Sequence, residues 1–196
     1  MQLGNTEART SGYGHAIVTS GANSPVSITA LAKIPSILTP LLEGILDSYD
    51  PITSEPSDHY EMPPKTEDKM EYNDLKLYLD DIREAAGFMS IVESSVTSIE
   101  SNSANASKRF LWAIQQRYKK VKKAVLLESG LTTFDQNSVM EFVKNNSDLI
   151  FQRVVEDFRK DIHTIKQFEQ ETIDASIFLI VVYGFINCKI LERPTI

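Results

Sequence analysis

Few residues in this sequence combine the side-chain type and the spacing that catalysis or metal binding requires. The single cysteine, Cys188, stands in an apolar stretch, and His163 is the nearest histidine in sequence. A reactive thiolate needs partial exposure and an activating neighbour, so we expect Cys188 to be a small buried packing residue. Asp161 and His163 are two positions apart, and on a helix such residues face different directions. The other histidines, His15 and His59, are too distant in sequence to complete a ligand set.

Sequence motifs for nucleotide binding and hydrolysis are also missing. The sequence contains no phosphate-binding loop of the G-x-x-x-x-G-K-[ST] type. Gly12-Tyr13-Gly14 falls short of the dinucleotide-binding pattern, because Ile17 fills the place of its last glycine. One cysteine also excludes a disulfide framework. We therefore predict that the chain is not an enzyme and uses no cofactor and no metal.

The strongest local charge is a basic run with the candidate partner-binding residues at its end. The run consists of Lys108, Arg109, Arg117, Lys119, Lys120, Lys122 and Lys123. It could neutralise phosphates of a nucleic acid, or it could complement acidic residues of this chain or of a partner. A net charge of -7 makes nucleic acid the less favoured reading, so we select Lys119, Lys120, Lys122 and Lys123 for protein binding.

An acidic run precedes the basic one. Its members are Glu67, Asp68, Glu71, Asp74, Asp80, Asp81 and Glu84. They are spread around the expected helix and are not aimed at one point, so we interpret them as a solvated face. An interaction between the acidic and the basic run is one way in which the basic charge could be balanced.

The elements that position these residues are predicted to be mostly helical. With 196 residues and 42% hydrophobic residues the chain can form one packed domain, which we place at residues 30–196. Residues 1–29 contain Gly4, Gly12, Gly14 and Gly21 and two short β-branched runs, and they predict a β-hairpin or a flexible arm outside the core. A short first helix is expected to start at Pro35 or at Pro40, and the proline-rich residues 50–66 indicate a linker.

An unbroken three-four spacing gives the clearest helical signal. The apolar residues Leu75, Tyr78, Ile82, Ala85, Met89, Val92, Val96 and Ile99 define one long amphipathic helix. Leu111, Ile114, Tyr118, Val121 and Val125 repeat the spacing in a second helix that ends near Gly130. We expect the two to pack as a long antiparallel helical hairpin.

The C-terminal half is predicted to be helical as well. Thr133 and Gln136 fit a capping box at the start of a helix, and residues 145–148 leave open whether that helix is broken. The last helix should run from about Thr172 to Leu191, stop before Pro194 and lie inside the bundle, because it is apolar nearly all round. Its apolar stretch Ile177–Ile186 is shorter than the roughly 20 residues of a spanning helix, so we expect no membrane span and a cytoplasmic protein.

Two short stretches resemble one bacterial family. Lys69-Met-Glu-Tyr-Asn73 resembles the opening of its first long helix, and Tyr183-Gly-Phe-Ile-Asn-Cys-Lys-Ile-Leu-Glu-Arg-Pro194 resembles its closing motif, with Gly184 where that motif has alanine. The family is the helical C-terminal domain of ABC-three-component conflict systems. Ile34-Pro-Ser-Ile-Leu38 is similar to its short opening helix. The resemblance covers roughly residues 30–196, although no effector enzyme precedes the helices in this sequence.

This resemblance implies a function that the residues alone do not select. It implies a non-enzymatic assembly module of an antiviral defence complex, which docks to a middle component and to an ABC-type ATPase of the same operon. Self-association is left open. The alternatives are a nucleic-acid-associated regulator that uses the basic segment 108–123, an enzyme with a dispersed site, and a membrane-docking protein.

Overall fold

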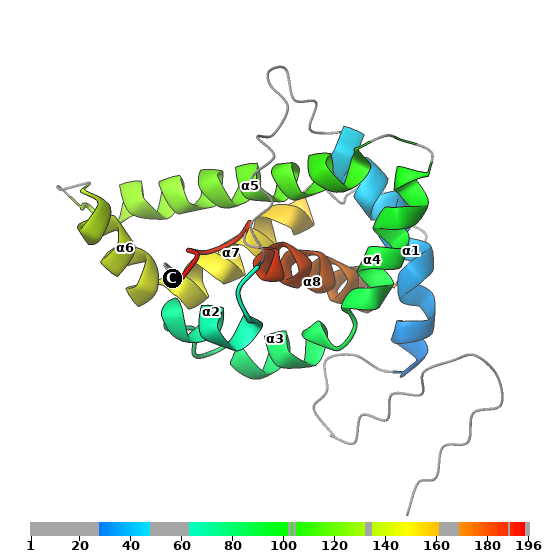
Figure 1. The fold of residues 1–196 in the computed structure, drawn as a ribbon, viewed down its shortest axis with the longest axis horizontal. Coiled ribbons are helices and arrows are strands. Elements are labelled where there is room, and N and C mark those ends of the chain that lie inside the picture. Colours follow the sequence, from blue (N-terminus) through cyan, green and yellow to red (C-terminus); the bar gives the residue numbers. More distant parts are fainter. Residues whose placement is uncertain are drawn as a thin grey trace, which may run out of the picture.

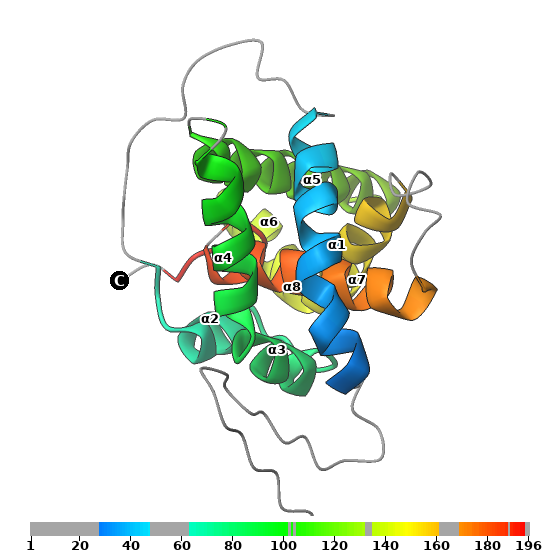
Figure 2. The ribbon, with the colours of Figure 1, turned by 90° about the vertical axis from the view of Figure 1, so that its right-hand side faces the viewer.

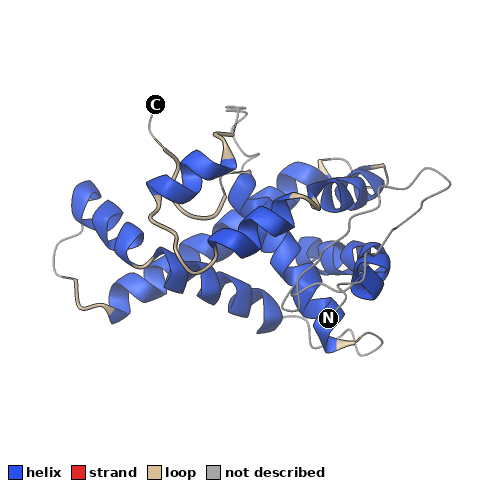
Figure 3. Cartoon of the chain, turned by 90° about the horizontal axis from the view of Figure 1, so that it is seen from below, coloured by secondary structure: helices blue, strands red, loops and turns tan. Residues whose placement is uncertain are grey.

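A computed structural model of the chain describes residues 28–47, 63–101, 103, 105–131, 135–160, 169–187 and 189–194. Within these ranges the chain is helical and contains no strand, which confirms a mostly α fold (Figures 1 and 3). The helices are α1 (Ile28–Asp47), α2 (Thr66–Tyr72), α3 (Leu79–Ala86), α4 (Met89–Glu100), α5 (Ala106–Glu128), α6 (Gln136–Asn145), α7 (Ser147–Lys160) and α8 (Gln170–Ile186). The expected arm lies outside the described residues, except that Ile28 and Thr29 begin α1.

The C-terminal helix α8 occupies the centre of the bundle, as predicted. Nearly all its side chains from Thr172 to Phe185 are buried, and it packs against α1, α3, α4, α5 and α7 (Figure 2). A helix that is apolar around its whole circumference removes its side chains from water only when neighbours cover every side. The central position of α8 therefore follows from its composition.

The end of α8 differs from the prediction. The helix stops at Ile186 with Asn187 as its cap, and it does not continue to Leu191. The Asn187 side-chain amide donates to the Tyr183 carbonyl at 2.9 Å, and the Lys189 amide reaches back to the Gly184 carbonyl at 2.9 Å. These bonds use carbonyl groups of the last turn, and Leu191 then adopts a left-handed φ of 60°.

Helix α1 begins earlier than either proline predicted. Pro35 and Pro40 both lie inside it, although an internal proline removes a hydrogen bond at a cost of about 3 kcal/mol. Burial explains this result, since each large apolar side chain contributes about 1.5–3 kcal/mol when fully buried. The buried face of α1 consists of Ile34, Ile37, Leu38, Leu41, Leu42, Ile45 and Leu46.

The expected long helix over residues 75–99 is two helices, so that prediction is wrong. Helix α3 ends at Ala86, a turn at Gly87 and Phe88 follows, and α4 starts at Met89. The turn keeps the apolar spacing in register, and Phe88 itself is buried in the core. The predicted seam is nevertheless buried from Leu75 to Ile99, with Tyr78 half-buried.

The expected antiparallel hairpin of the two apolar seams, residues 75–99 and 111–125, is not confirmed. Helix α4 lies beside α1 and runs in the same direction, whereas α5 leaves the end of α4 and crosses the molecule (Figures 1 and 2). Asn105, directly before α5, adopts a left-handed φ of 60°, which redirects the chain. Helix α5 then packs mainly on α7 and α1.

The segment after residue 135 is broken, which answers the question that the sequence left open. Helix α6 ends at Asn145, Asn146 is its cap, and α7 begins at Ser147. The cap at the start of α6 is Asp135, whose carboxylate accepts from the amides of Asn137 and Ser138 at 3.0 Å. The cap therefore lies two residues after the predicted cap Thr133, which is outside the described residues.

No helix in the described part of the chain combines the length and the apolarity that crossing a membrane requires.

Candidate functional site

The four lysines selected from the sequence do not form one surface. Lys119 and Lys123 are exposed and make no ion pair within the described residues. Lys120 Nζ lies 3.1 Å from a carboxylate oxygen of Asp157, and Lys122 Nζ lies 2.7 Å from Glu192 Oε1. Helical periodicity explains the division, because positions 119 and 123 share one stripe of α5. Lys119 and Lys123 are therefore the two of the four lysines that make no ion pair in the described part of the chain.

Arg117, also in the basic run, is a core residue. Its side chain is 4% exposed, and its guanidinium lies 3.4 Å from Asp157 Oδ2 and over the Phe158 ring at 4.7 Å. A buried cation requires a countercharge of this kind, since burial of an isolated charge is costly. Asp157 of α7 thus forms ion pairs with both Arg117 and Lys120.

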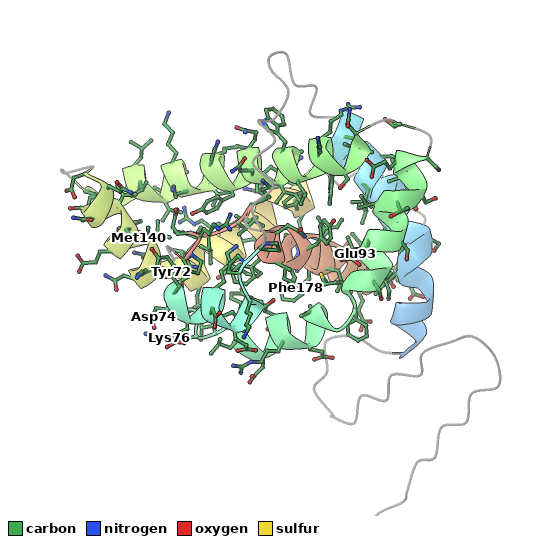
Figure 4. The ribbon with its side chains drawn as sticks, viewed as in Figure 1. Tyr72, Asp74, Lys76, Glu93, Met140 and Phe178 are labelled. Atoms are coloured by element: carbon green, nitrogen blue, oxygen red, sulfur yellow. The ribbon has the colours of Figure 1, made fainter. Side chains whose placement is uncertain are left out.

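The acidic run does not meet the basic one. Arg83 of α3 pairs with Glu67 at 2.8 Å and with Asp80 at 3.3 Å, and Lys76 pairs with Asp74 at 2.9 Å. Asp68 and Glu71 stay exposed on α2. Figure 4 shows Asp74 and Lys76 at the edge of the molecule beside α2, on the side opposite α5. The two charged runs therefore face away from each other.

The C-terminal segment after α8 is bound by polar side chains of α2 and α5. Glu192 accepts hydrogen bonds from the Tyr118 hydroxyl and from Lys122 Nζ, both at 2.7 Å. Burial raises the pKa of Glu192, but the bonds from Lys122 and Tyr118 and the charges of Lys122 and Lys69 outweigh it. The pKa of Glu192 is therefore below its ordinary value of 4.5, and the carboxylate is ionised at neutral pH.

Lys69 is the most deeply buried cation at this place. It is 1% exposed, although it stands in the short, polar helix α2. Its Nζ donates to the Phe185 carbonyl in the last turn of α8 and to the Ile190 carbonyl at 2.8 Å, and it lies 4.3 Å from the centroid of the Phe185 ring. A cation beside the carbonyl groups at a helix C-terminus is favourably placed with respect to the helix dipole. Lys69 thus joins α2 to the end of α8.

Asn73 binds the same segment one helical turn further along. The side chain is fully buried, and its amide donates to the Lys69 and Glu192 carbonyls at 2.8 Å. Its Oδ1 accepts the Glu192 backbone amide at 2.9 Å. Asn73 therefore satisfies both backbone groups of Glu192, as a neighbouring strand would. We call Lys69, Asn73, Tyr118, Lys122 and Glu192 the tail clamp.

Gly184 allows the closest approach between α8 and α5. A Cβ atom at this position would lie 2.5 Å from Ile114 Cγ2, closer than side chains approach each other. The close packing of α8 on Ile114 therefore depends on the absence of a side chain at this position. The glycine is required by packing and not by its backbone conformation.

Sequence reasoning missed the tail clamp as a set of contacts. Lys69 and Asn73 belong to the first of the two motifs, and their four-residue separation places them on one helix face. The chemistry of the clamp is structural, since Lys69 donates to backbone carbonyl groups and Glu192 is held by two donors. The described residues include no group of three metal-ligating side chains. Asp161, His163 and Cys188 lie outside the described residues.

Comparison with known proteins gives no relative for this arrangement. The chain matches no protein family, no curated protein and no solved structure. The resemblance to ABC-three-component systems therefore stays a prediction.

Proposed function

We propose that this chain is a non-enzymatic assembly module of a multi-component bacterial antiviral defence system and acts in the cytoplasm. Its partners are the proteins of the same operon, namely a middle component and an ABC-type ATPase. The bundle serves as a rigid body that presents a binding surface, and it carries out no reaction by itself.

One observation supports this proposal above the others: the two motifs that carry the family resemblance are in contact. Lys69 and Asn73 of the first motif bind the backbone of Phe185, Ile190 and Glu192 in the second, more than a hundred positions later. Two short matches that are unrelated in space could arise by chance. Motif residues that bind each other are what a shared domain architecture predicts.

The outward face of α5 is the partner surface that we propose. Lys119 and Lys123 project from the stripe of α5 opposite its buried residues, and Leu127 follows them with 67% of its surface exposed. Exposed charges of one sign steer a partner and set its orientation more than they add affinity. A leucine beside them supplies apolar area that a partner can cover.

The nucleic-acid alternative loses three of the seven cations of the basic run to internal pairs in the folded chain. Arg117, Lys120 and Lys122 are balanced by Asp157 and Glu192, so three cations of the basic run are committed to internal pairs. A backbone-binding stripe needs several free cations, because each neutralised phosphate contributes to the salt dependence of binding. These internal pairs make the basic run a weaker basis for such binding than its sequence suggests.

The test is co-expression of the operon with an affinity tag on this chain, followed by pull-down. We expect the tagged chain to recover the middle component or the ATPase, and Lys119→Glu/Lys123→Glu to recover less of it. Recovery of this chain alone, together with intact defence after its deletion, would contradict the proposal. Binding of nucleic acid that weakens steeply with salt would favour the alternative.

A matched control distinguishes the effect of the α5 surface from the effect of the change in net charge. Lys65 and Lys160 are exposed lysines outside α5. The variant Lys65→Glu/Lys160→Glu changes the net charge by the same amount and should retain the partner. Equal loss in both variants would show that only net charge matters.

A further inference from the structure

The segment that follows α8, residues 189–194, is bound to the bundle but forms no helix or strand of its own (Figure 1, red). Side chains of α2 and of its cap hold its backbone. Lys69 Nζ donates to the Ile190 carbonyl at 2.8 Å, and Asn73 binds both backbone groups of Glu192 at 2.8 and 2.9 Å. A helix, by contrast, is held by hydrogen bonds within its own backbone. Detaching the segment from Lys69 and Asn73 therefore breaks no helical hydrogen bond.

The side chains that hold the segment also have contacts that do not involve it. Lys69 Nζ donates to the Phe185 carbonyl of α8 as well, and the Asn73 side-chain amide also donates to the Lys69 carbonyl at 2.8 Å. Lys122 Nζ lies 5.4 Å from the centroid of the Tyr118 ring, and the Lys122 side chain is 25% exposed. Burying a polar group is costly chiefly when it has no partner. An open segment therefore leaves Lys69 and Asn73 with partners and Lys122 with access to water.

One residue, Glu192, concentrates the polar contacts that keep the segment in place. Its carboxylate accepts from the Tyr118 hydroxyl and from Lys122 Nζ at 2.7 Å, in addition to the backbone bonds with Asn73. The residue before it, Leu191, adopts a left-handed φ of 60°, which is unfavourable for a residue with a side chain. The bonds of Glu192 and the burial of Leu191 must offset this strain. The bound position of the segment is thus a balance of a few contacts.

We propose that residues 189–194 form a strap that opens and closes as a unit while the helices stay folded, and that Glu192 is its latch. Opening withdraws the Glu192 carboxylate from α5 and exposes Ile190 and Leu191. It also uncovers the side of α8 at Gly184, where a Cβ atom would lie 3.2 Å from Ile190 Cδ1. Proteins open locally at free energies well below that of global unfolding, in cooperative units of contiguous residues. The inference does not depend on which partner the chain binds.

The experiment measures amide hydrogen exchange of the full chain by NMR at increasing urea concentrations. The Glu192 amide reports on the strap, because its acceptor is Asn73 Oδ1. The Val182 amide, in the middle of α8, reports on unfolding of the bundle. Relative to unstructured peptides, the Glu192 amide should exchange at least about 100-fold faster than that of Val182 and depend only weakly on urea, since local opening exposes little surface. Equal rates with equal urea dependence would overturn the proposal, because the segment then opens only when the chain unfolds.

A pair of lysine substitutions tests the latch. Lys122→Met removes a charged donor to Glu192, so exchange of the Glu192 amide should become about 10- to 100-fold faster. Lys123→Met, at the next and exposed lysine of α5, changes the net charge equally and should leave this rate unchanged. The same exchange rate in both variants would show that Glu192 is not the latch.

A core substitution tests whether the strap is independent of the bundle. Ile37 is fully buried in α1, which lies apart from the segment in both views (Figures 1 and 2). Ile37→Val weakens the whole bundle, so exchange of the Val182 amide should become about 3- to 10-fold faster. Exchange of the Glu192 amide should not change, because the strap opens without unfolding α1. Acceleration of both amides by the same factor would mean that the strap has no opening of its own.

Discussion

The same residue type has opposite roles in two regions of this molecule. Lys69 is inside the tail clamp, where its charge contacts backbone carbonyl groups and an aromatic ring. Lys119 and Lys123 are exposed to solvent on α5. A buried lysine is costly to leave without partners, and an exposed lysine costs the fold almost nothing. The comparison therefore predicts large stability effects in the clamp and small ones on α5, where binding should change instead.

The largest effect is expected for Phe185→Ala. Phe185 is fully buried, its ring lies 6.2 Å from that of Phe151, and Lys69 Nζ lies above it. Removing a buried phenylalanine leaves a cavity and costs about 3–5 kcal/mol. Urea denaturation should show this loss in the free energy of unfolding. Unchanged thermal stability would reject the central position of α8.

The second largest loss of stability is expected for Lys69→Met. The methionine keeps most of the aliphatic chain and removes the ammonium group, which leaves the Phe185 and Ile190 carbonyls without this donor. With about 1–3 kcal/mol for each unsatisfied buried group, we expect a loss of about 2–4 kcal/mol in the free energy of unfolding. Lys65→Met, on the exposed residue before α2, is the matched control and should stay within about 0.5 kcal/mol. Equal effects of both substitutions would contradict the clamp.

Glu192→Gln tests the clamp through pH. The folded-state pKa of Glu192 is below 4.5, so its carboxylate stabilises the fold at higher pH, and this contribution is lost as pH falls through the folded pKa. We expect a loss of about 1–2 kcal/mol at pH 7, because a charged acceptor is replaced by a neutral one.

The pH dependence supplies the control for this prediction. Between pH 7 and pH 3 the wild type should lose more stability than Glu192→Gln, as urea midpoints at both pH values would show. Glu93→Gln, on the exposed face of α4 (Figure 4), is the control. It should change neither the free energy of unfolding at pH 7 nor the loss of stability between pH 7 and pH 3. Parallel pH profiles for the wild type and Glu192→Gln would mean that the carboxylate is not stabilised in the fold.

The smallest effect on stability is expected for Lys119→Glu/Lys123→Glu. Surface substitutions of this kind are usually within about 0.5 kcal/mol each. By contrast, Lys120→Glu/Lys122→Glu places new carboxylates beside Asp157 and Glu192 and should lower the free energy of unfolding clearly. Thermal melts of both variants sharpen the comparison. If they are equally stable, the two lysine pairs do not differ in their structural role.

Parts of this fold were predictable because they depend on local periodicity. The seam from Leu75 to Ile99 is buried as its spacing predicts, and α8 is central because of its composition. The break between α3 and α4 was not predictable, since Gly87 and Phe88 keep the apolar register while the chain turns. The early start of α1 was missed because burial against α8 and α4 outweighs the local penalty of Pro35 and Pro40.

The contacts of the candidate site were even less predictable from local sequence patterns. The basic run was visible in the sequence, but its division into paired and free lysines depends on Asp157 and Glu192, which other segments bring to α5. Lys69 and Asn73 are ordinary polar residues of a short helix until the C-terminal segment covers them. A partner that is more than a hundred positions away leaves no signal in the local pattern.

The sequence by itself therefore determined the helical class and the buried faces, because side-chain hydrophobicity and helical periodicity are local properties. Only the tertiary structure decided where the helices turn, which lysines are neutralised and which remain exposed. The physical reason is that charge balance and buried hydrogen bonds depend on pairs of distant residues. Their geometry exists only once the core around α8 is packed.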